Sequence, residues 1–372
     1  MDFSSDYSVS FAEACMDFRK IIENTIVPMN LPEKEKQDCY DKVIGCVKDI
    51  LPNKLYRFRV CSERSLSAFY NDELWFSNGS AMNDDFDARL YYDKKKIENW
   101  LNSFLSQNEG LKAIEKLVTM EQPPLEIQNL IPNAKYLFEN LKKIPKEQII
   151  ASSNSLIQYL LSNLDAELKK ATEEVRQMTK FACFTQKIYS DMMWGQYSNN
   201  ATGFALEYEL GEQNVVTNFV NDKLDNVWIN LFPVIYDNKR LDTTAYVAYL
   251  FQIKVLLGIV QSVGVAYDSA WINTVVPCPD EFMVTKLAIK KSTDWKAEKE
   301  WRMFYTTNNM TWSKEKYSYV IQKPSGVYLG RKISKLNQKI IVDMAKEKKI
   351  PVYKMDFNER SRNYRLKCCR IL

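Results

Sequence analysis

The sequence predicts an α+β fold with a mixed or antiparallel sheet at its core. Short aromatic-rich runs typical of strands occur at LYRFR and ELWFSN, and again after residue 180. Between these groups, residues 93–180 repeat apolar side chains at helical spacing, which indicates a helical insertion after the second strand. With 46% hydrophobic and 26% charged residues, the 372-residue chain has the composition of a soluble globular protein.

Residues 1–52 are expected to form an N-terminal helical segment. The α+β core domain then covers residues 53–372 and contains the insertion. Pro52 marks the boundary, because proline interrupts a helix. Apolar side chains recur at helical spacing at Phe11, Cys15, Phe18, Ile21 and Ile22.

Within the core domain, LYRFR and ELWFSN predict the first two strands, and Ser62 can N-cap a helix between them. Helical spacing predicts a long helix over about 241–267 and another over 335–348. Further strands are predicted at FACFTQ, GFALEYEL, LFPVIYD, WRMFY, VYLG and PVYKMDF.

The chain contains no histidine, which is the usual general base near neutral pH and the commonest metal ligand. Ser-His-Asp hydrolysis, Cys-His hydrolysis and histidine-containing zinc sites therefore cannot be built from this chain alone. The eight cysteines lack the spacing of a zinc ribbon or a disulfide scaffold, so we expect reduced thiols. Catalysis would have to use other side chains or a metal bound through oxygen.

The first residues of the chain predict a cytoplasmic protein, because acidic side chains stand where a secretory signal carries lysine and arginine. The longest uncharged part of the most apolar stretch, residues 255–267, has 13 residues. A stretch of this length is too short to span a bilayer, so we expect no membrane partner.

The net charge of +4 is unevenly distributed along the chain. Residues 331–372 hold 13 Lys or Arg against 4 Asp or Glu, a local excess of nine positive charges. Such a segment can bind the phosphates of a nucleic acid. The alternative, which we favour in the absence of an RNA-binding motif, is a solvated basic face.

The run LYRFR would present two cations together if it forms a strand. Side chains alternate along a strand, so Tyr56 and Phe58 share one face while Arg57 and Arg59 share the other with Leu55. A pair of guanidinium groups suits a pyrophosphate or a carboxylate. An edge strand with salt-bridged arginines is an equally common explanation.

The run LWFSNGSAMNDDFD places Ser77 and Ser80 at the end of a strand and three carboxylates directly after it, at Asp84, Asp85 and Asp87. These side chains are typical of a turn in which they cap backbone groups. Alternatively, the three carboxylates hold Mg²⁺ or Ca²⁺ through oxygen, although the spacing is not that of an EF-hand.

The run TDWKAEKEWRMFY contains a pair of glutamates. As a strand from residue 298, it turns Glu298, Glu300 and Arg302 to one side and an apolar set to the other. Two close carboxylates raise the pKa of one of them, which prepares that group to accept a proton. A helical turn with Glu298 paired to Arg302 is the alternative.

The run DMMWGQYSNNATGFALEYE brackets small and polar residues between Gly195 and Gly203. Such a stretch can shape a ligand-binding loop. The more common role of its aromatic residues Trp194 and Tyr197 is packing.

Together, these runs resemble, in order, the bacterial family catalogued as domain of unknown function 2971. The series consists of LYRFR, LWFS with MNDDFD, ACFTQ, MWGQYSNNATGFALEYE, LFPVIYD, KSTDWKAEKEWR and VYLG. The similarity covers about residues 55–330. This family has no settled activity, so the resemblance implies a fold and not a function.

A more distant resemblance is to ADP-ribosyltransferases of the Arg, Ser, Glu type, whose motifs line an NAD cleft in a split sheet. Here Arg57 or Arg59, Ser77 and the Glu298-Lys299-Glu300 run occur in that order, without the Ser-Thr-Ser triplet. The resemblance implies that Glu300 stabilises the oxocarbenium ion formed from NAD, that Glu298 activates the acceptor, and that Ser77 orients Glu300. The NAD-binding residues would be Tyr56, Arg57, Arg59 and Ser77.

Three functions are compatible with these patterns. The first is an NAD-consuming ADP-ribosyltransferase or NAD glycohydrolase of a bacterial stress or phage-defence system. The second is a magnesium-dependent nuclease that uses Asp84, Asp85 and Asp87 with the two glutamates. The third is a non-enzymatic binding or regulatory module, with the helical insertion as its partner surface.

Overall fold

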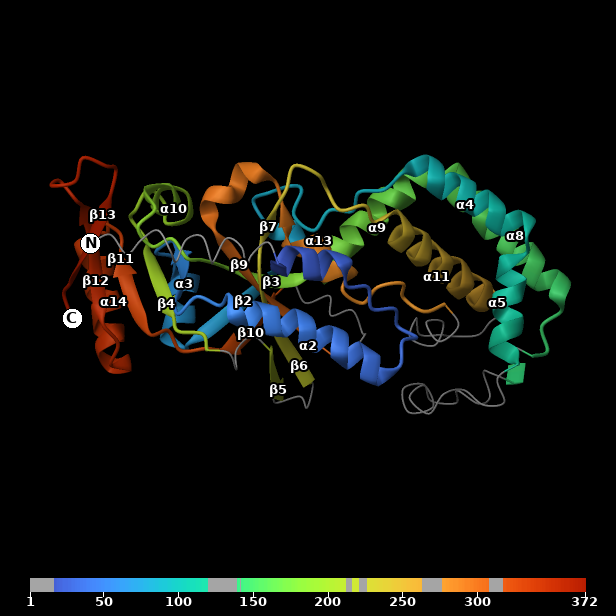
Figure 1. Ribbon diagram of the computed structural model, residues 1–372, viewed down its shortest axis with the longest axis horizontal. Coiled ribbons are helices and arrows are strands. Elements are labelled where there is room, and N and C mark those ends of the chain that lie inside the picture. Colours follow the sequence, from blue (N-terminus) through green and yellow to red (C-terminus); the bar gives the residue numbers. More distant parts are fainter. Residues whose placement is uncertain are drawn as a thin grey trace.

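The computed structural model combines an open, mostly antiparallel sheet with a group of packed helices at one end of an elongated molecule (Figure 1). It describes residues 17–119, 139–140, 142–211, 216–220, 226–262, 276–307 and 317–372. The predicted α+β class with a mixed or antiparallel sheet is confirmed.

The sheet has eleven strands, which run in the order β13-β12-β11-β4-β1-β3-β9-β6-β5, with β2 and β10 as a branch. Each predicted strand run overlaps an observed strand. Among the strand pairs described in this sheet, β11 and β12 alone are parallel. The strands are β1 Leu55–Arg59, β2 Glu73–Asn78, β3 Lys180–Thr185, β4 Phe204–Tyr208, β5 Val216–Val220, β6 Asn226–Pro233, β9 Glu300–Thr307, β10 Tyr317–Ile321, β11 Gly326–Leu329, β12 Val352–Phe357 and β13 Leu366–Arg370.

The sheet forks at one edge of β3. At the start of β3, Phe181 pairs with Ser77 of β2, and at its end Thr185 pairs with Tyr56 of β1. Both β3 residues also pair with β9, which therefore occupies the opposite edge. Residues 182–184 pair with no described strand on the first edge. The strands β1 and β2 thus diverge from β3 and leave room between them.

The N-terminal helices lie against the sheet and share its hydrophobic core. Residues 17–24 are helical, and α2 covers Glu33–Asp49. Phe18 and Val43 are fully buried in the same cluster as Phe232 of β6. The predicted helical character of this segment is confirmed from residue 17, while Phe11 and Cys15 lie outside the described residues.

Two further helices pack beside the sheet as predicted. The helix α3 Glu63–Tyr70 follows β1, and the Ser62 hydroxyl accepts a hydrogen bond from the Ser65 amide at 3.2 Å. The helix α14 Lys335–Lys348 precedes β12. Both predictions rest on local signals, a cap and a helical apolar spacing.

The helical insertion is confirmed in its described residues, and it forms a second hydrophobic core with a helix from later in the chain. The insertion supplies α4 Lys94–Ser106, α5 Glu109–Val118, α8 Lys146–Ser162 and α9 Leu164–Met178. The later helix, α11 Thr244–Ser262, packs against them. The end of the predicted 241–267 helix lies outside the described residues.

Helix α11 corrects the membrane argument from the sequence. Its 19 residues, with a mean hydropathy of 1.4 over one window, make it the one helix in the described part of the chain that is long and apolar enough to cross a bilayer. The uncharged run comprises only the 13 residues after Lys254. The helix also includes Lys254 and the residues before it, so the apolar helix is longer than that run. Lys254 pairs with Glu167 of α9, and the buried residues of α11 belong to the helical core.

Candidate functional site

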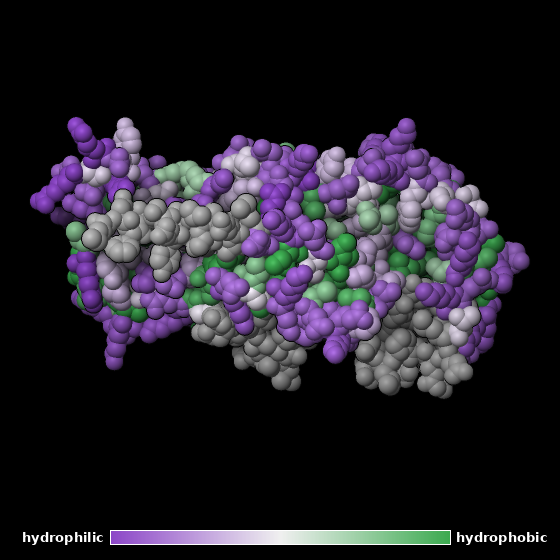
Figure 2. All heavy atoms as spheres, viewed as in Figure 1, coloured by the Kyte–Doolittle hydropathy of each residue, from purple (hydrophilic) through white to green (hydrophobic). Residues whose placement is uncertain are grey.

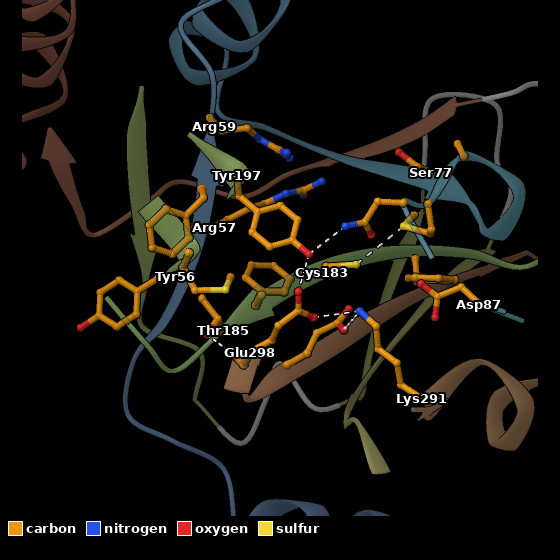
Figure 3. Close-up of a pocket in the computed structure, with 18 residues that line it drawn as sticks. Tyr56, Arg57, Arg59, Ser77, Asp87, Cys183, Thr185, Tyr197, Lys291 and Glu298 are labelled. Atoms are coloured by element: carbon orange, nitrogen blue, oxygen red, sulfur yellow. Dashed lines mark hydrogen bonds and ion pairs between the residues drawn. The ribbon is translucent and has the colours of Figure 1, made fainter. Parts of the chain in front are cut away.

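A pocket of about 300 Å³ lies in the fork of the sheet. Its lining includes all six residues that the sequence analysis assigned to NAD binding or catalysis: Tyr56, Arg57, Arg59, Ser77, Glu298 and Glu300. These residues come from β1, from β2 and from the segment that leads into β9, so the fold brings distant parts of the chain together. Figure 3 shows Arg57 and Arg59 on one side of Tyr197, and Glu298 with Lys291 on the other.

The two arginines form a cationic wall, and they project as strand alternation predicted. Tyr56 and Phe58 pack with Trp194 in a separate cluster, and β1 lies between β4 and β3 rather than at an edge. Neither Arg57 nor Arg59 forms an ion pair with a carboxylate among the described residues. The alternative of a salt-bridged edge strand is therefore wrong.

Arg57 is only 7% exposed, yet its hydrogen-bonding capacity is not filled. Its Nη2 donates to the carbonyl oxygen of Trp75 at 2.5 Å, while its buried Nη1 has no partner. Burial, and then the charge of Arg59, lower the pKa of Arg57 to about 9. A buried guanidinium group without a counter-charge is costly, so this wall is suited to an anionic ligand.

The two glutamates form the opposite wall, but the secondary structure that carries them differs from the predicted strand. A 3₁₀ helix, η3 Thr293–Glu298, ends at the first glutamate, and β9 begins at Glu300. Lys299 between them has a left-handed backbone with φ of 47°. The predicted strand from residue 298 is therefore wrong by two residues, because this turn precedes it.

Glu300 is held by cations on both carboxylate oxygens. Arg302 donates from Nε to Oε1 at 2.8 Å and from Nη2 to Oε2 at 3.2 Å, and Lys291 Nζ lies 3.0 Å from Oε2. Burial would raise the pKa of Glu300, but the charges of Arg302 and Lys291 outweigh it and lower the pKa to about 2. Glu300 is thus ionised at neutral pH, with its charge already compensated.

Glu298 has a different environment although it is also only 2% exposed. One oxygen lies 2.8 Å from Lys291 Nζ, and the other accepts a hydrogen bond from the Tyr197 hydroxyl. Burial raises the pKa of Glu298, against the effect of Lys291. Asn83 in turn donates to the Tyr197 oxygen at 3.0 Å. Glu298 is therefore the carboxylate suited to take up a proton, and the alternative of a helical turn with a Glu298–Arg302 pair is wrong.

Ser77 lines the pocket but does not contact the glutamates. No hydrogen bond joins it to Glu300 in the structure, and Figure 3 shows it across the pocket from Glu298. Its place is set by β2, where it pairs with Phe181 of β3 and Tyr317 of β10. The expected orientation of Glu300 by Ser77 is therefore wrong, and Arg302 and Lys291 have that role instead.

The three aspartates after β2 are used separately. Asp84 accepts a hydrogen bond from the Phe86 amide at 2.9 Å, Asp85 is exposed, and Asp87 pairs with Arg302 at 2.8 Å. Within the described ranges, no group of three or more His, Cys, Asp or Glu side chains is placed to hold a metal ion. The turn interpretation fits Asp84, and the arrangement does not favour a magnesium site.

Sequence reasoning missed Lys291, Cys183 and Thr185, and treated Tyr197 mainly as a packing residue. Lys291 lies on the short strand β8 Lys290–Lys291, which pairs in parallel with β7 Ile235–Tyr236. Two lysines directly after the apolar run LAI were the available signal for it. Tyr197 ends the helix α10 Asp191–Tyr197 and faces the pocket, which supports the ligand-loop interpretation of that run.

Comparison with known families agrees with the ordered motifs from MWGQYSNNATGFALEYE to KSTDWKAEKEWR. Residues 193–303 match the model of the family described as protein of unknown function (DUF2971). This match confirms the resemblance to the DUF2971 family. The matched segment includes Tyr197, Lys291, Glu298 and Glu300 of the pocket, whereas the arginines of β1 precede it. No curated protein and no solved structure matches the chain.

Proposed function

We propose that this pocket binds NAD and consumes it, as an ADP-ribosyltransferase or an NAD glycohydrolase. The observation that carries the proposal is the opposed charge of the two walls, with Arg57 and Arg59 unmatched on one and Glu298 on the other. The pyrophosphate of NAD is a dianion, and its nicotinamide ribose becomes positive as the glycosidic bond breaks. A volume of about 300 Å³ is at the lower end for ligand pockets. We therefore expect the pocket to enclose only the pyrophosphate and the nicotinamide ribose of NAD.

The chemistry divides between the walls. The bond from ribose C1′ to the nicotinamide nitrogen breaks, its electron pair leaves with nicotinamide, and the ribose becomes an oxocarbenium ion. Ionised Glu298 stabilises this ion more strongly than it stabilises the ground state. A hydroxyl group of the acceptor, or water, then bonds to C1′, and its proton passes to Glu298.

This assignment changes the roles expected from the sequence. Stabilisation of the oxocarbenium ion was expected from Glu300, but both oxygens of Glu300 are bound by cations, whereas one oxygen of Glu298 is bound only by the neutral Tyr197 hydroxyl. We therefore assign stabilisation as well as proton transfer to Glu298. Glu300 and Asp87 would instead hold Arg302 and Lys291 in place.

The decisive test is release of nicotinamide from NAD by the purified protein, with and without candidate acceptors. We expect Glu298→Gln to abolish release, because the amide keeps the shape of the side chain but carries no charge. We expect Arg59→Gln to raise KM. The control is Glu209→Gln, which removes an exposed carboxylate outside the pocket and should leave release unchanged. Absence of release by the wild type, or equal release by Glu298→Gln, would contradict the proposal.

The other two functions have less support. A magnesium nuclease would need the aspartates after β2 to converge, and Asp87 is instead paired with Arg302. A non-enzymatic module that uses the helical insertion as its partner surface would not need a buried arginine with a free donor in the sheet. NAD is an intracellular metabolite, so the proposed activity agrees with a cytoplasmic protein in bacterial stress or phage defence.

We also propose a nucleic-acid partner for the basic segment, bound at the connection between β12 and β13. Arg360, Arg362 and Arg365 are exposed there and pair with no carboxylate among the residues described. Tyr364 between them is fully exposed. Guanidinium groups bind phosphates and an exposed aromatic ring stacks on bases, as in single-strand binding. Figure 2 shows hydrophilic residues gathered over this corner of the molecule.

Fluorescence anisotropy with labelled single-stranded DNA and RNA over a range of salt concentrations tests this partner. If Arg360 and Arg362 each contact one phosphate, replacing both by Ala should reduce the salt slope by roughly 1.4. Lys339→Ala, an exposed cation on α14, is the control and should change the slope little. An unchanged slope in the double variant would contradict the proposal.

A further inference from the structure

A second pocket, of about 290 Å³, lies outside the candidate site, where the sheet meets the helical group. It is bounded by the segment before α4, the segment before α11 and helix α9. The first two segments run side by side, joined by a bridge between Tyr91 and Asp242 and by the Thr243 amide, which donates to the Tyr91 carbonyl oxygen at 2.8 Å. Its lining residues are Arg89, Leu90, Tyr91, Tyr92, Lys169, Thr172 and Arg240.

The lining of this pocket carries positive charge without negative charge. Arg89, Lys169 and Arg240 contribute to it, and no Asp or Glu does. None of the three pairs with a carboxylate in the described part of the chain. Arg89 Nη1 donates to the carbonyl oxygen of Asp85 at 3.2 Å, its one acceptor among the residues that the structure describes. Three cations around one hollow repel each other, so an anion bound there would be stabilised.

Arg240 is fixed in place before any ligand binds. Its Nη2 donates to the carbonyl oxygens of Arg89 and Leu90, at 2.8 and 2.7 Å. Its guanidinium group lies 5.3 Å from the ring centre of Phe86 and 5.5 Å from that of Tyr91. Its other two nitrogen atoms donate to no described protein atom. An oriented guanidinium group with free donors matches the geometry of a phosphate.

We propose that this second pocket binds a phosphate-bearing small molecule. The phosphate contacts Arg89, Lys169 and Arg240, and the exposed ring of Tyr91 provides an apolar surface beside them. The ligand is free phosphate or pyrophosphate, or the phosphate end of a nucleotide. The proposal does not depend on NAD consumption, because the two pockets share no lining residue.

Calorimetric titration with pyrophosphate tests the proposal, and the Arg59→Gln background weakens binding to the first pocket so that the second pocket can be followed alone. In that background we expect one remaining site. Lys169→Gln should weaken it about tenfold or more, and so should Arg240→Gln. Lys169 is exposed, so its replacement does not endanger the fold. The controls are Lys170→Gln and Lys239→Gln, which remove neighbouring charges that do not line the pocket.

The outcomes separate the two proposals. No pyrophosphate binding in the Arg59→Gln background, or binding that Lys169→Gln and Arg240→Gln leave unchanged, overturns the second pocket. If Arg59→Gln leaves pyrophosphate binding to both pockets unchanged, the result counts instead against the NAD pocket. The same titration with ADP distinguishes the sources: tighter binding than pyrophosphate identifies a nucleotide, and equal or weaker binding identifies the phosphate group alone.

Discussion

Two glutamates only two positions apart differ because their neighbours differ. Glu300 receives two donors from Arg302 and one from Lys291, whereas Glu298 shares Lys291 and accepts its other bond from neutral Tyr197. The same burial thus gives a lowered pKa for Glu300 and a raised one for Glu298. The first group stabilises the fold, and the second is available for chemistry.

This difference predicts opposite consequences of two matched substitutions. Glu300→Gln leaves the buried Arg302 and Lys291 short of negative charge and should reduce the free energy of unfolding by about 3–5 kcal/mol. Glu298→Gln leaves Lys291 paired with Glu300 and should cost less than half of that. Urea unfolding followed by circular dichroism measures both. Equal losses would show that Glu300 has no special structural role.

The low pKa of Glu300 also predicts how stability depends on pH. The pKa is about 2 in the folded protein and 4.5 ordinarily, so the unfolded chain takes up the proton first as the pH falls. Stability from this group is complete above pH 4.5 and is lost towards pH 2, by roughly 3 kcal/mol. Unfolding curves between pH 2 and 6 should show a steeper fall for the wild type than for Glu300→Gln. Parallel curves would contradict this.

The raised pKa of Glu298 predicts the acidic limb of the activity profile. NAD consumption requires the ionised form, so kcat should fall with an apparent pKa above the ordinary 4.5. The Tyr197 hydroxyl stabilises the anion, so Tyr197→Phe should move this limb to higher pH. Steady-state rates across the pH range measure the shift. A limb that stays in place would mean that Tyr197 does not position Glu298.

At the scale of single elements, the cationic wall depends on a close approach between β1 and the start of β4. A Cβ atom at Gly203 would stand 2.1 Å from the carbonyl oxygen of Arg59. Gly203→Ala should therefore displace the end of β1, weaken pyrophosphate binding to the first pocket at least tenfold in the Arg240→Gln background, and cost about 1–3 kcal/mol of stability. The control is Gly195→Ala in α10, which meets nothing within 4 Å and should add about 0.5–1 kcal/mol. Unchanged binding in Gly203→Ala would show that β1 tolerates the shift.

Elements with a strong local pattern were predictable from the sequence. Strand alternation correctly placed Arg57 and Arg59 on one face, because a five-residue strand fixes that geometry by itself. The cap at Ser62 correctly predicted the start of α3. Both features depend on residues within a few positions of each other.

Features set by distant pairing could not be predicted. The start of β9 at Glu300 depends on the left-handed turn at Lys299, a conformation that lysine rarely adopts. Lys291 reaches the pocket only because β8 pairs with β7, which lies more than fifty positions earlier. The fork follows from two strands that share one edge of β3. Sequence order alone contains none of these registers.

At the scale of the whole molecule, the two largest hydrophobic cores predict two units of stability. Leu256 of α11 and Leu329 of β11 are both fully buried, one in the helical core and one in the sheet core. Each Leu→Ala substitution leaves a cavity and should cost about 2–5 kcal/mol, mainly in its own core. Leu256→Ala should therefore speed amide exchange in the helical group and leave the sheet protected, and Leu329→Ala should do the reverse.

Pyrophosphate binding provides an independent test of whether the helical core and the sheet core are separate units. The candidate site is built on the sheet, so Leu256→Ala should leave the affinity of the first pocket unchanged when it is measured in the Arg240→Gln background. Leu329 pairs with Phe204, the neighbour of Gly203, so Leu329→Ala should weaken that affinity. If either substitution instead speeds exchange equally in both parts, the molecule unfolds as one cooperative unit, and the helical group cannot be a separately stable part of it.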